Sequence, residues 1–292
     1  MTHSAQRQLP SGDHEIVLDG VRQVFHTAGR GPVMVAHSGG PGASYETLRS
    51  EGLEQHFTMV YVEPVGTGAS GRLPDPTAYS MDVYVRFLAA VIEHLQVGPV
   101  YVLGHSYGGC VAQQITLDHP GLVAGLVLYD STPVLNEEFV EAAGEAAIVF
   151  GERHKDQPEA VAAVEAFFSR PDSDESAAVR TRAVKPLYFG DFWAHRERLA
   201  PLLARQRSFV DPGRAKDARS FDARARLGEI TVPTVIIVGA QDFICGPRWA
   251  GRLHDGIPGS RLVVLKNSGH YGHLEEPGAF VEAVVSGLPV AG

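Results

Sequence analysis

A serine between two glycines, in the pentapeptide G-H-S-Y-G at residues 104–108, carries the strongest chemical signal in the sequence. An apolar run typical of a strand precedes it, and a segment typical of a helix follows. A sharp turn between a strand and a helix leaves its central serine exposed as a nucleophile. Side chains at 104 and 108 would collide with a neighbouring strand or helix, and the turn needs permissive backbone. We therefore predict that Ser106 is a catalytic nucleophile.

A serine hydroxyl needs a partner that accepts its proton, because it is a weak nucleophile at neutral pH. That partner is usually a histidine oriented by a carboxylate. In proteins with this kind of turn, the acid and then the histidine follow the serine, each on a loop after a strand. Asp242 follows the apolar run 234–238, and His270 follows the run 261–265. We predict that Ser106, Asp242 and His270 form a catalytic triad.

Two residues remain open as alternatives to the predicted acid and base. Asp130 also ends an apolar run, at 125–129, and could serve as the acid. His273 lies three residues after the predicted base and could take its place, although a packing role fits it better. We interpret three further candidates, which adjoin the turn or shape a loop, as structural: His37, His105 and Cys110.

The tetrahedral intermediate of such a reaction needs hydrogen-bond donors for its negative oxygen. Loss of one donor costs about 2.7–4 kcal/mol of barrier. One donor is expected to be the backbone N–H of Tyr107, the residue after the nucleophile. The glycine-rich loop after the apolar run 32–36 is expected to supply the second, with Gly40 as the first choice and Gly39 as the next.

Alternating strands and helices are expected to position these residues. Ser80 is a typical N-cap for a helix whose apolar stripe runs from 83 to 95. Asp19-Gly20 predicts a hairpin turn. Together, buried strands that alternate with amphipathic helices predict an α/β fold with a mostly parallel central sheet, covered by helices on both faces. The apolar runs predicted as buried strands are 32–36, 59–62, 100–103, 125–129, 234–238 and 261–265.

One long segment departs from this alternation. Between residues 133 and 225 the apolar runs vanish, alanine, glutamate and arginine dominate, and helical periodicity appears at 159–168. We predict that 133–225 is an inserted helical cap, and that 1–132 and 226–292 form the core.

Composition narrows the classes of partner. The 292-residue chain has a formal net charge of −9, which gives no support to binding of nucleic acid or anionic membranes. Residues 1–8 lack the apolar region of a signal peptide, and two cysteines fit a reducing compartment. We expect a soluble cytoplasmic protein that acts on a small molecule or short peptide and needs no metal or cofactor. A monomer and a homo-oligomer are both compatible with the sequence.

Several motifs of the chain match one protein family: G-G-P-G at 39–42, E-P-V-G-T-G-A-S at 63–70, G-H-S-Y-G-G at 104–109, the acid loop, and S-G-H at 268–270. By these motifs the chain resembles α/β-hydrolases and, among them, the proline iminopeptidase family. The resemblance covers about residues 15–132 and 226–287. Two departures stand out: Ser38 separates His37 from the glycines that usually follow the histidine directly, and Glu63-Pro64 replaces the usual Asp-Gln.

The resemblance implies a serine hydrolase that works through an acyl-enzyme, in particular an aminopeptidase that releases a small N-terminal residue. In that family, acidic cap residues hold the free amino terminus of the substrate. The alternative is an ester, lactone or C–C bond hydrolase for a small apolar metabolite, which an apolar cap pocket would favour. A non-hydrolytic ligand-binding member is a third alternative. The cap residues that would bind substrate are Glu137, Glu141, Asp191 and Trp193. Taken alone, each acid fits a solvated helix face better, and the aromatic segment 188–193 could equally anchor the cap on the core.

Overall fold

The computed structural model describes residues 9–40, 42–205, 207–209 and 220–289. Pro41 of the glycine-rich loop and the N-terminal residues 1–8 lie outside the described residues, as does the stretch 210–219 of the predicted cap.

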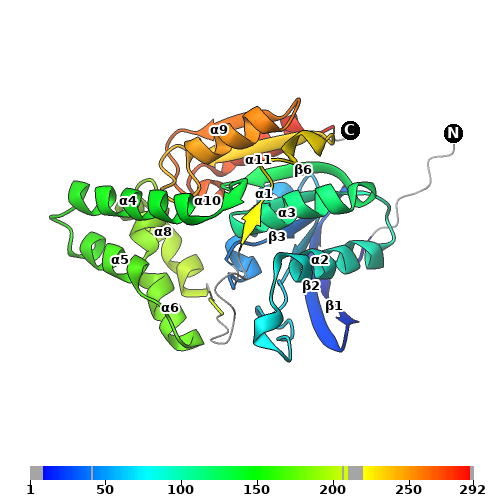
Figure 1. Cartoon of the computed structure of the whole chain (residues 1–292), viewed down its shortest axis with the longest axis horizontal. Coiled ribbons are helices and arrows are strands. Elements are labelled where there is room, and N and C mark those ends of the chain that lie inside the picture. The colour runs from blue at the N-terminus through cyan, green and yellow to red at the C-terminus, as the bar shows by residue number, and fades with distance from the viewer. Residues whose placement is uncertain (1–8, 41, 206, 210–219, 290–292) are drawn as a thin grey trace.

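An eight-stranded sheet forms the centre of the molecule (Figure 1). The strands are β1 (Gly12–Leu18), β2 (Val21–Gly29), β3 (Val33–His37), β4 (Thr58–Val62), β5 (Val100–His105), β6 (Val123–Tyr129), β9 (Thr234–Gly239) and β10 (Arg261–Leu265). Their order in the sheet is β1-β2-β4-β3-β5-β6-β9-β10. The pairs β1–β2 and β2–β4 are antiparallel and all other neighbours are parallel. The predicted mostly parallel sheet is confirmed.

Burial explains why the strands read as continuous apolar runs. Every residue of β3, β4, β5 and β9 is buried, because helices cover the sheet on both sides. The predicted hairpin joins β1 to β2, where Asp19 and Gly20 both have positive φ angles, as a two-residue hairpin turn requires.

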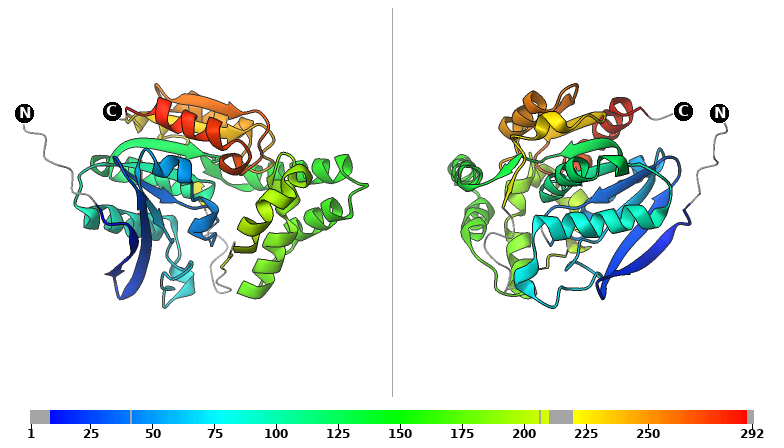
Figure 2. Two further views of the ribbon diagram at one scale, coloured as in Figure 1. Left: turned by 180° about the vertical axis from the view of Figure 1, so that it is seen from behind. Right: turned by 45° about the vertical axis from the view of Figure 1, so that its right-hand side comes forward.

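Helices cover both faces of the sheet with separate apolar clusters. Side chains of α2 (Met81–Leu95), α3 (Tyr107–Asp118) and α9 (Pro247–Gly256) belong to one cluster. Those of α1 (Glu51–Glu54) and α11 (Pro277–Gly287) belong to the other. Seen from behind, α11 and α10 (Gly272–Glu275) lie in front of the sheet (Figure 2, left). Short 3-10 turns are η1 (Tyr45–Thr47), η2 (Pro76–Ala78), η3 (Pro120–Leu122) and η4 (Leu227–Glu229).

The segment predicted as an insertion is helical. Helices α4, α5, α6 and α8 lie beside the sheet, at the end of the molecule away from β1 (Figure 1). Only one side of α4 is buried, which explains why no long apolar run appears in this part of the sequence. The elements are β7 (Val134–Leu135), α4 (Glu137–Arg153), α5 (Pro158–Phe168), α6 (Asp174–Ala183), α7 (Lys185–Tyr188), α8 (Phe192–Arg205) and β8 (Phe221–Asp222).

A two-stranded pairing at the base of this segment has no counterpart in the sequence prediction. β7 and β8 pair antiparallel, with Leu135 opposite Phe221. Two segments that are far apart in the chain therefore meet here. Strands of two residues are too short to show a period in the sequence.

Among the helices of the described ranges, none has the length and apolar character that crossing a membrane requires.

A histidine between two carboxylates ties β2 to its neighbours. His26 Nδ1 lies 2.7 Å from Asp13 Oδ1, and its Nε2 lies 2.7 Å from Glu63 Oε1. Burial lowers the pKa of His26, but hydrogen bonds and charge from Glu63 and Asp13 outweigh this effect, so its pKa is raised above the usual value.

We predict that His26→Gln lowers the free energy of unfolding by about 1–2 kcal/mol at pH 5.5. Because the folded pKa is raised, this stabilisation is complete below the unfolded pKa, about 6.5, and is lost as the pH rises through the folded pKa. Urea unfolding at pH 5.5 and 8.5 measures the difference. The exposed His56 supplies a matched control, His56→Gln. An equal loss at both pH values would contradict the prediction.

Candidate active site

Ser106 occupies a strained turn between β5 and α3. Its backbone has φ 55° and ψ −123°, a combination that residues other than glycine rarely adopt. The Ser106 N–H donates to the carbonyl of Tyr129 at 3.0 Å, and the hydroxyl of Ser131 donates to the Ser106 carbonyl at 2.9 Å. The side chain is only half-buried. The neighbouring strand thus holds a serine in a conformation that presents its hydroxyl.

The glycines around the serine are required by close backbone contacts. A Cβ atom on Gly104 would lie 2.3 Å from the carbonyl oxygen of Gly108. One on Gly108 would lie 2.2 Å from the carbonyl oxygen of His37. Both distances are far below van der Waals contact, and this is the collision expected from the sequence.

Asp242 and His270 meet at the same edge of the sheet. They follow β9 and β10, two adjacent parallel strands, and His270 Nδ1 lies 2.8 Å from Asp242 Oδ2. Both side chains are buried. The other carboxylate oxygen of Asp242 accepts hydrogen bonds from the N–H groups of Ile244 (2.9 Å) and Cys245 (3.1 Å). The carboxylate is therefore fixed on one side of the imidazole, and Nε2 is left as the nitrogen that can exchange a proton.

The alternative base, His273, lies in α10 and has both ring nitrogens engaged in hydrogen bonds. Its Nε2–H donates to the carbonyl of Thr47 at 2.8 Å, and its Nδ1 accepts from the hydroxyl of Tyr129 at 3.0 Å. Burial lowers the pKa of His273 to about 4. With both nitrogens engaged, His273 is poorly suited to act as the base.

The other residues that we interpreted as structural are also buried. His105 bonds through Nε2 to the carbonyl of His270 at 2.9 Å, and burial holds its pKa well below the usual value. Burial lowers the pKa of His37 to about 4 and raises that of Cys110 to about 12. At neutral pH, Cys110 is therefore a protonated thiol and His37 is a neutral imidazole.

The glycine-rich loop lies directly against the serine. A Cβ atom on Gly39 would lie 2.8 Å from Cβ and 3.4 Å from Oγ of Ser106, so only a glycine fits there without displacing the nucleophile. Gly40 has φ +120° and is exposed. Both glycines line the same cavity as Ser106, and Tyr107 begins α3 beside it. Gly39 is thus a loop residue in contact with the serine, and the choice of Gly40 or Gly39 as the second oxyanion donor stays a prediction.

Ser106 and His270 line a cavity of about 550 Å³, a size that suits a small molecule. The glycine-rich loop lines it from the core. Most of the remaining lining residues lie between residues 139 and 188, on helices α4 to α7 and the connections between them, and many of them are apolar or aromatic. These apolar lining residues include Phe139, Ala143, Phe167, Phe168, Val184 and Ile244.

The charges around the cavity are all positive within the described part of the chain. Arg170, Arg180 and Lys185 line it, and no aspartate or glutamate does. The Arg180 guanidinium donates to the carbonyls of Ala166 (3.0 Å) and Phe167 (2.9 Å), which are neutral acceptors. The cavity therefore offers no described carboxylate to a cationic substrate.

Lys185 is the most unusual of these cations because it is buried. Its ammonium group donates to the hydroxyl of Tyr271 at 3.3 Å and lies 4.7 Å from the centre of that ring. Burial lowers the pKa of Lys185 to about 7. The sequence analysis missed Lys185 and Tyr271. A lone lysine in a polar helical segment gives no signal, although the position of Tyr271 next to the predicted base offered one.

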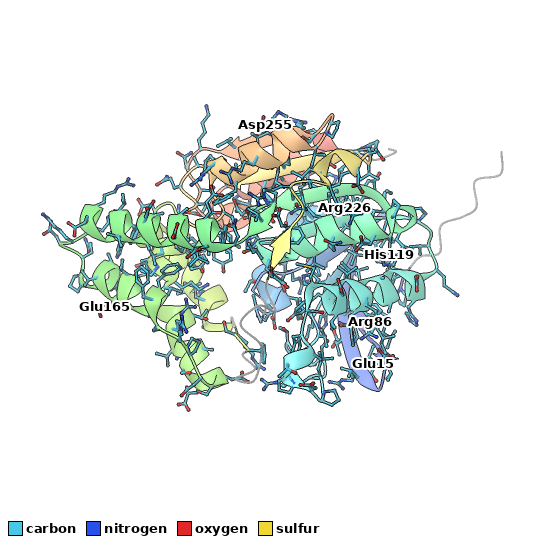
Figure 3. The ribbon with its side chains drawn as sticks, viewed as in Figure 1. Glu15, Arg86, His119, Glu165, Arg226 and Asp255 are labelled. Atoms are coloured by element: carbon cyan, nitrogen blue, oxygen red, sulfur yellow. The ribbon has the colours of Figure 1, made fainter. Side chains whose placement is uncertain are left out.

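The acidic cap residues expected to bind substrate do not line the cavity. Glu137 and Glu141 are exposed on α4, whose cavity side carries Phe139 and Ala143. Asp191 is also exposed, and its carboxylate accepts a hydrogen bond from the N–H of Ala194 at the start of α8 (2.9 Å). Other acidic side chains of this segment also face outward, as Glu165 does on the outer side of α5 (Figure 3). Helix orientation, which no local pattern specified, accounts for the difference.

Trp193 likewise lies away from the cavity lining. Its indole N–H donates to Glu159 at 3.0 Å, and its ring stacks on Phe150. Of the aromatic segment 188–193, Tyr188 lines the cavity, whereas Phe189 and Phe192 pack with Tyr271. The segment thus both lines the pocket and anchors the helices.

Comparisons with known proteins agree with this architecture. A family model described as alpha/beta hydrolase fold matches residues 32–277. The 2-hydroxymuconate semialdehyde hydrolase of Pseudomonas sp. (strain CF600) is 27% identical over 289 residues, which cover 96% of this chain and 95% of that protein. The proline iminopeptidase of Lactobacillus crispatus (strain ST1) is 26% identical over 273 residues, covering 86% and 87%. The solved structure of an alpha/beta fold family hydrolase from Bacillus anthracis str. Sterne superposes with a TM-score of 0.73 at 19% identity, covering 95% and 99%. The chain belongs to the α/β-hydrolase fold family and is an enzyme of the hydrolase class.

Proposed function

We propose that this enzyme is a serine hydrolase for a small, largely apolar ester, lactone or C–C bond substrate, rather than an aminopeptidase. The observation that carries the proposal is the cavity lining, which is apolar and cationic and contains no carboxylate among the described residues. As part of the same proposal, segment 133–225 is a cap that walls this cavity. Both cysteines are free and buried, which supports a reducing compartment such as the cytoplasm.

In the proposed mechanism, His270 Nε2 removes the proton of Ser106 as Oγ attacks the substrate carbonyl. Asp242, bonded to His270 Nδ1 at 2.8 Å, orients the ring and stabilises its positive charge. Backbone N–H groups of Tyr107 and of the glycine-rich loop receive the negative oxygen. His270 then returns the proton to the leaving group, and water releases the acyl group from Ser106 by the reverse sequence.

The charge of the cavity argues against an aminopeptidase. Such an enzyme must place a substrate ammonium group next to the scissile carbonyl, and therefore near Ser106. With Lys185 and Arg180 on the cavity wall, that ammonium meets groups that carry like charge and finds no carboxylate partner among the described residues. Because one relative is a proline iminopeptidase, aminopeptidase activity is the second candidate function. The other relative is named for 2-hydroxymuconate semialdehyde, a small metabolite, and so supports the first.

We predict that the wild type cleaves a short-chain aryl ester at least 100-fold faster than a proline arylamide. Ser106→Ala should lower ester turnover by at least about 10³-fold, because the nucleophile is lost. Chromogenic assays of both substrates measure this. Ser286→Ala, an exposed serine on α11, is the matched control. Efficient arylamide cleavage would favour the aminopeptidase, and ester turnover that survives Ser106→Ala would refute the mechanism.

We also predict that Lys185 favours substrates that carry a carboxylate. Lys185→Met should lower kcat/KM about 10- to 100-fold for an aryl ester with a terminal carboxylate, because a charged hydrogen bond contributes about 1.5–3 kcal/mol. The matching uncharged ester should be much less affected. With a pKa of about 7, Lys185 is protonated at lower pH, so the preference should weaken as the pH rises above 7.

The measurement is kcat/KM for the two esters at pH 6 and pH 8.5. Lys266→Met, an exposed lysine after β10, is the control. If Lys185→Met slows both esters equally, Lys185 does not recognise the carboxylate.

A further inference from the structure

A second buried aspartate lies at the edge of the sheet that carries the proposed triad. Asp130 directly follows β6, which lies between β5 and β9 and therefore between the strands that lead to Ser106 and Asp242. Its side chain is fully buried and its backbone is left-handed, with φ 44°. An aspartate in this conformation is uncommon away from turns and functional sites.

The carboxyl group of Asp130 faces a backbone donor and the side chains of Asp242 and Tyr129. One oxygen, Oδ1, accepts a hydrogen bond from the N–H of Gly239 at 2.8 Å. The other, Oδ2, has no hydrogen-bond partner among the described residues. A carboxyl oxygen of Asp130, a ring nitrogen of His270 and a ring nitrogen of His105 all lie within 4.8 Å of one another. Asp130 therefore lies beside both the proposed base and the proposed acid.

Two carboxyl groups beside one imidazole cannot both be ionised without strong repulsion. The ionisable groups around Asp130 are Asp242, Tyr129, His105, His270 and Cys245. Burial, and then the charge of Asp242, raise the pKa of Asp130 well above its usual value. Asp242 bonds directly to His270 Nδ1 and accepts two backbone N–H groups, so the negative charge resides on Asp242.

We propose that Asp130 is a second acid of this site, protonated while Asp242 is ionised and able to become the ionised partner of His270 when Asp242 cannot. This inference rests on the proposed function, since it assigns Asp130 as a positioning residue for the base. When Asp242 loses its charge, Asp130 releases its proton to water. Its carboxylate then stabilises the positive charge that His270 gains when it takes the proton of Ser106.

The test compares Asp242→Asn with the double variant Asp242→Asn/Asp130→Asn. Loss of the orienting carboxylate in a triad typically costs about 10⁴ in kcat. Because Asp130 can then become the ionised partner of His270, we expect Asp242→Asn to lower kcat only about 10²-fold. The double variant should lower kcat at least tenfold further. Asparagine is the right replacement because it keeps an acceptor for Gly239 N–H and tolerates left-handed backbone.

A pH profile separates this role from a structural one. The residual activity of Asp242→Asn should rise with pH as Asp130 ionises, and the double variant should lack that step. The control is Asp242→Asn/Asp255→Asn, in which the second change is an exposed residue of α9 (labelled in Figure 3), and it should match Asp242→Asn.

Equal activity and equal pH profiles in Asp242→Asn and the double variant would overturn the inference. Should a variant fail to fold, a ¹³C NMR titration of the Asp130 carboxyl in the wild type decides instead, and an ionised Asp130 at pH 7 would contradict the proposal. These outcomes differ from failure of the proposed function, in which the wild type itself would show no turnover dependent on Ser106.

Discussion

The strained backbone at Ser106 is the constraint on which the rest of the site depends. Its left-handed conformation lets β5 turn directly into α3, and backbone hydrogen bonding to Tyr129 of β6 holds it in place. The turn works only because backbone atoms meet where side chains would clash, with Gly108 against His37 and Gly39 against the serine itself. The stability of the surrounding sheet thus offsets a locally unfavourable conformation that exposes one hydroxyl.

Parallel strand direction accounts for the composition of the site. The carboxyl ends of parallel strands meet at one edge of the sheet, so loops far apart in the chain converge there. The loop after β3 contributes Gly39, and those after β5, β6, β9 and β10 contribute Ser106, Asp130, Asp242 and His270. Burial and hydrogen bonding then give the histidines at this edge different properties. His273 and His105 are held by hydrogen bonds and have lowered pKa values, whereas His270 keeps a carboxylate partner and lines the cavity.

The charged residues that line the cavity differ from those that the sequence analysis expected to bind substrate. The sequence analysis named Glu137 and Glu141 of α4 as substrate-binding residues. Both side chains are exposed, and the same helix presents Phe139 and Ala143 to the cavity. Lys185 shows the opposite case. It is one lysine in an unremarkable polar stretch, yet it is buried beside Tyr271. The electrostatic character of the pocket therefore depends on how the helices of this segment pack, not on their net composition.

The sequence alone determined the alternation of strands and helices, the sharp turn at Ser106 and the loops that carry Asp242 and His270. These features are local: continuous apolar runs mark strands buried on both faces, and glycines mark backbone that tolerates no side chain. Tertiary structure alone decided the contact between Asp242 and His270, the neighbouring position of Asp130, the pairing of β7 with β8, and the lining of the cavity by Lys185 rather than Glu137. Each of these depends on which segments meet in space, and short helices with one buried side leave that orientation unspecified until they pack.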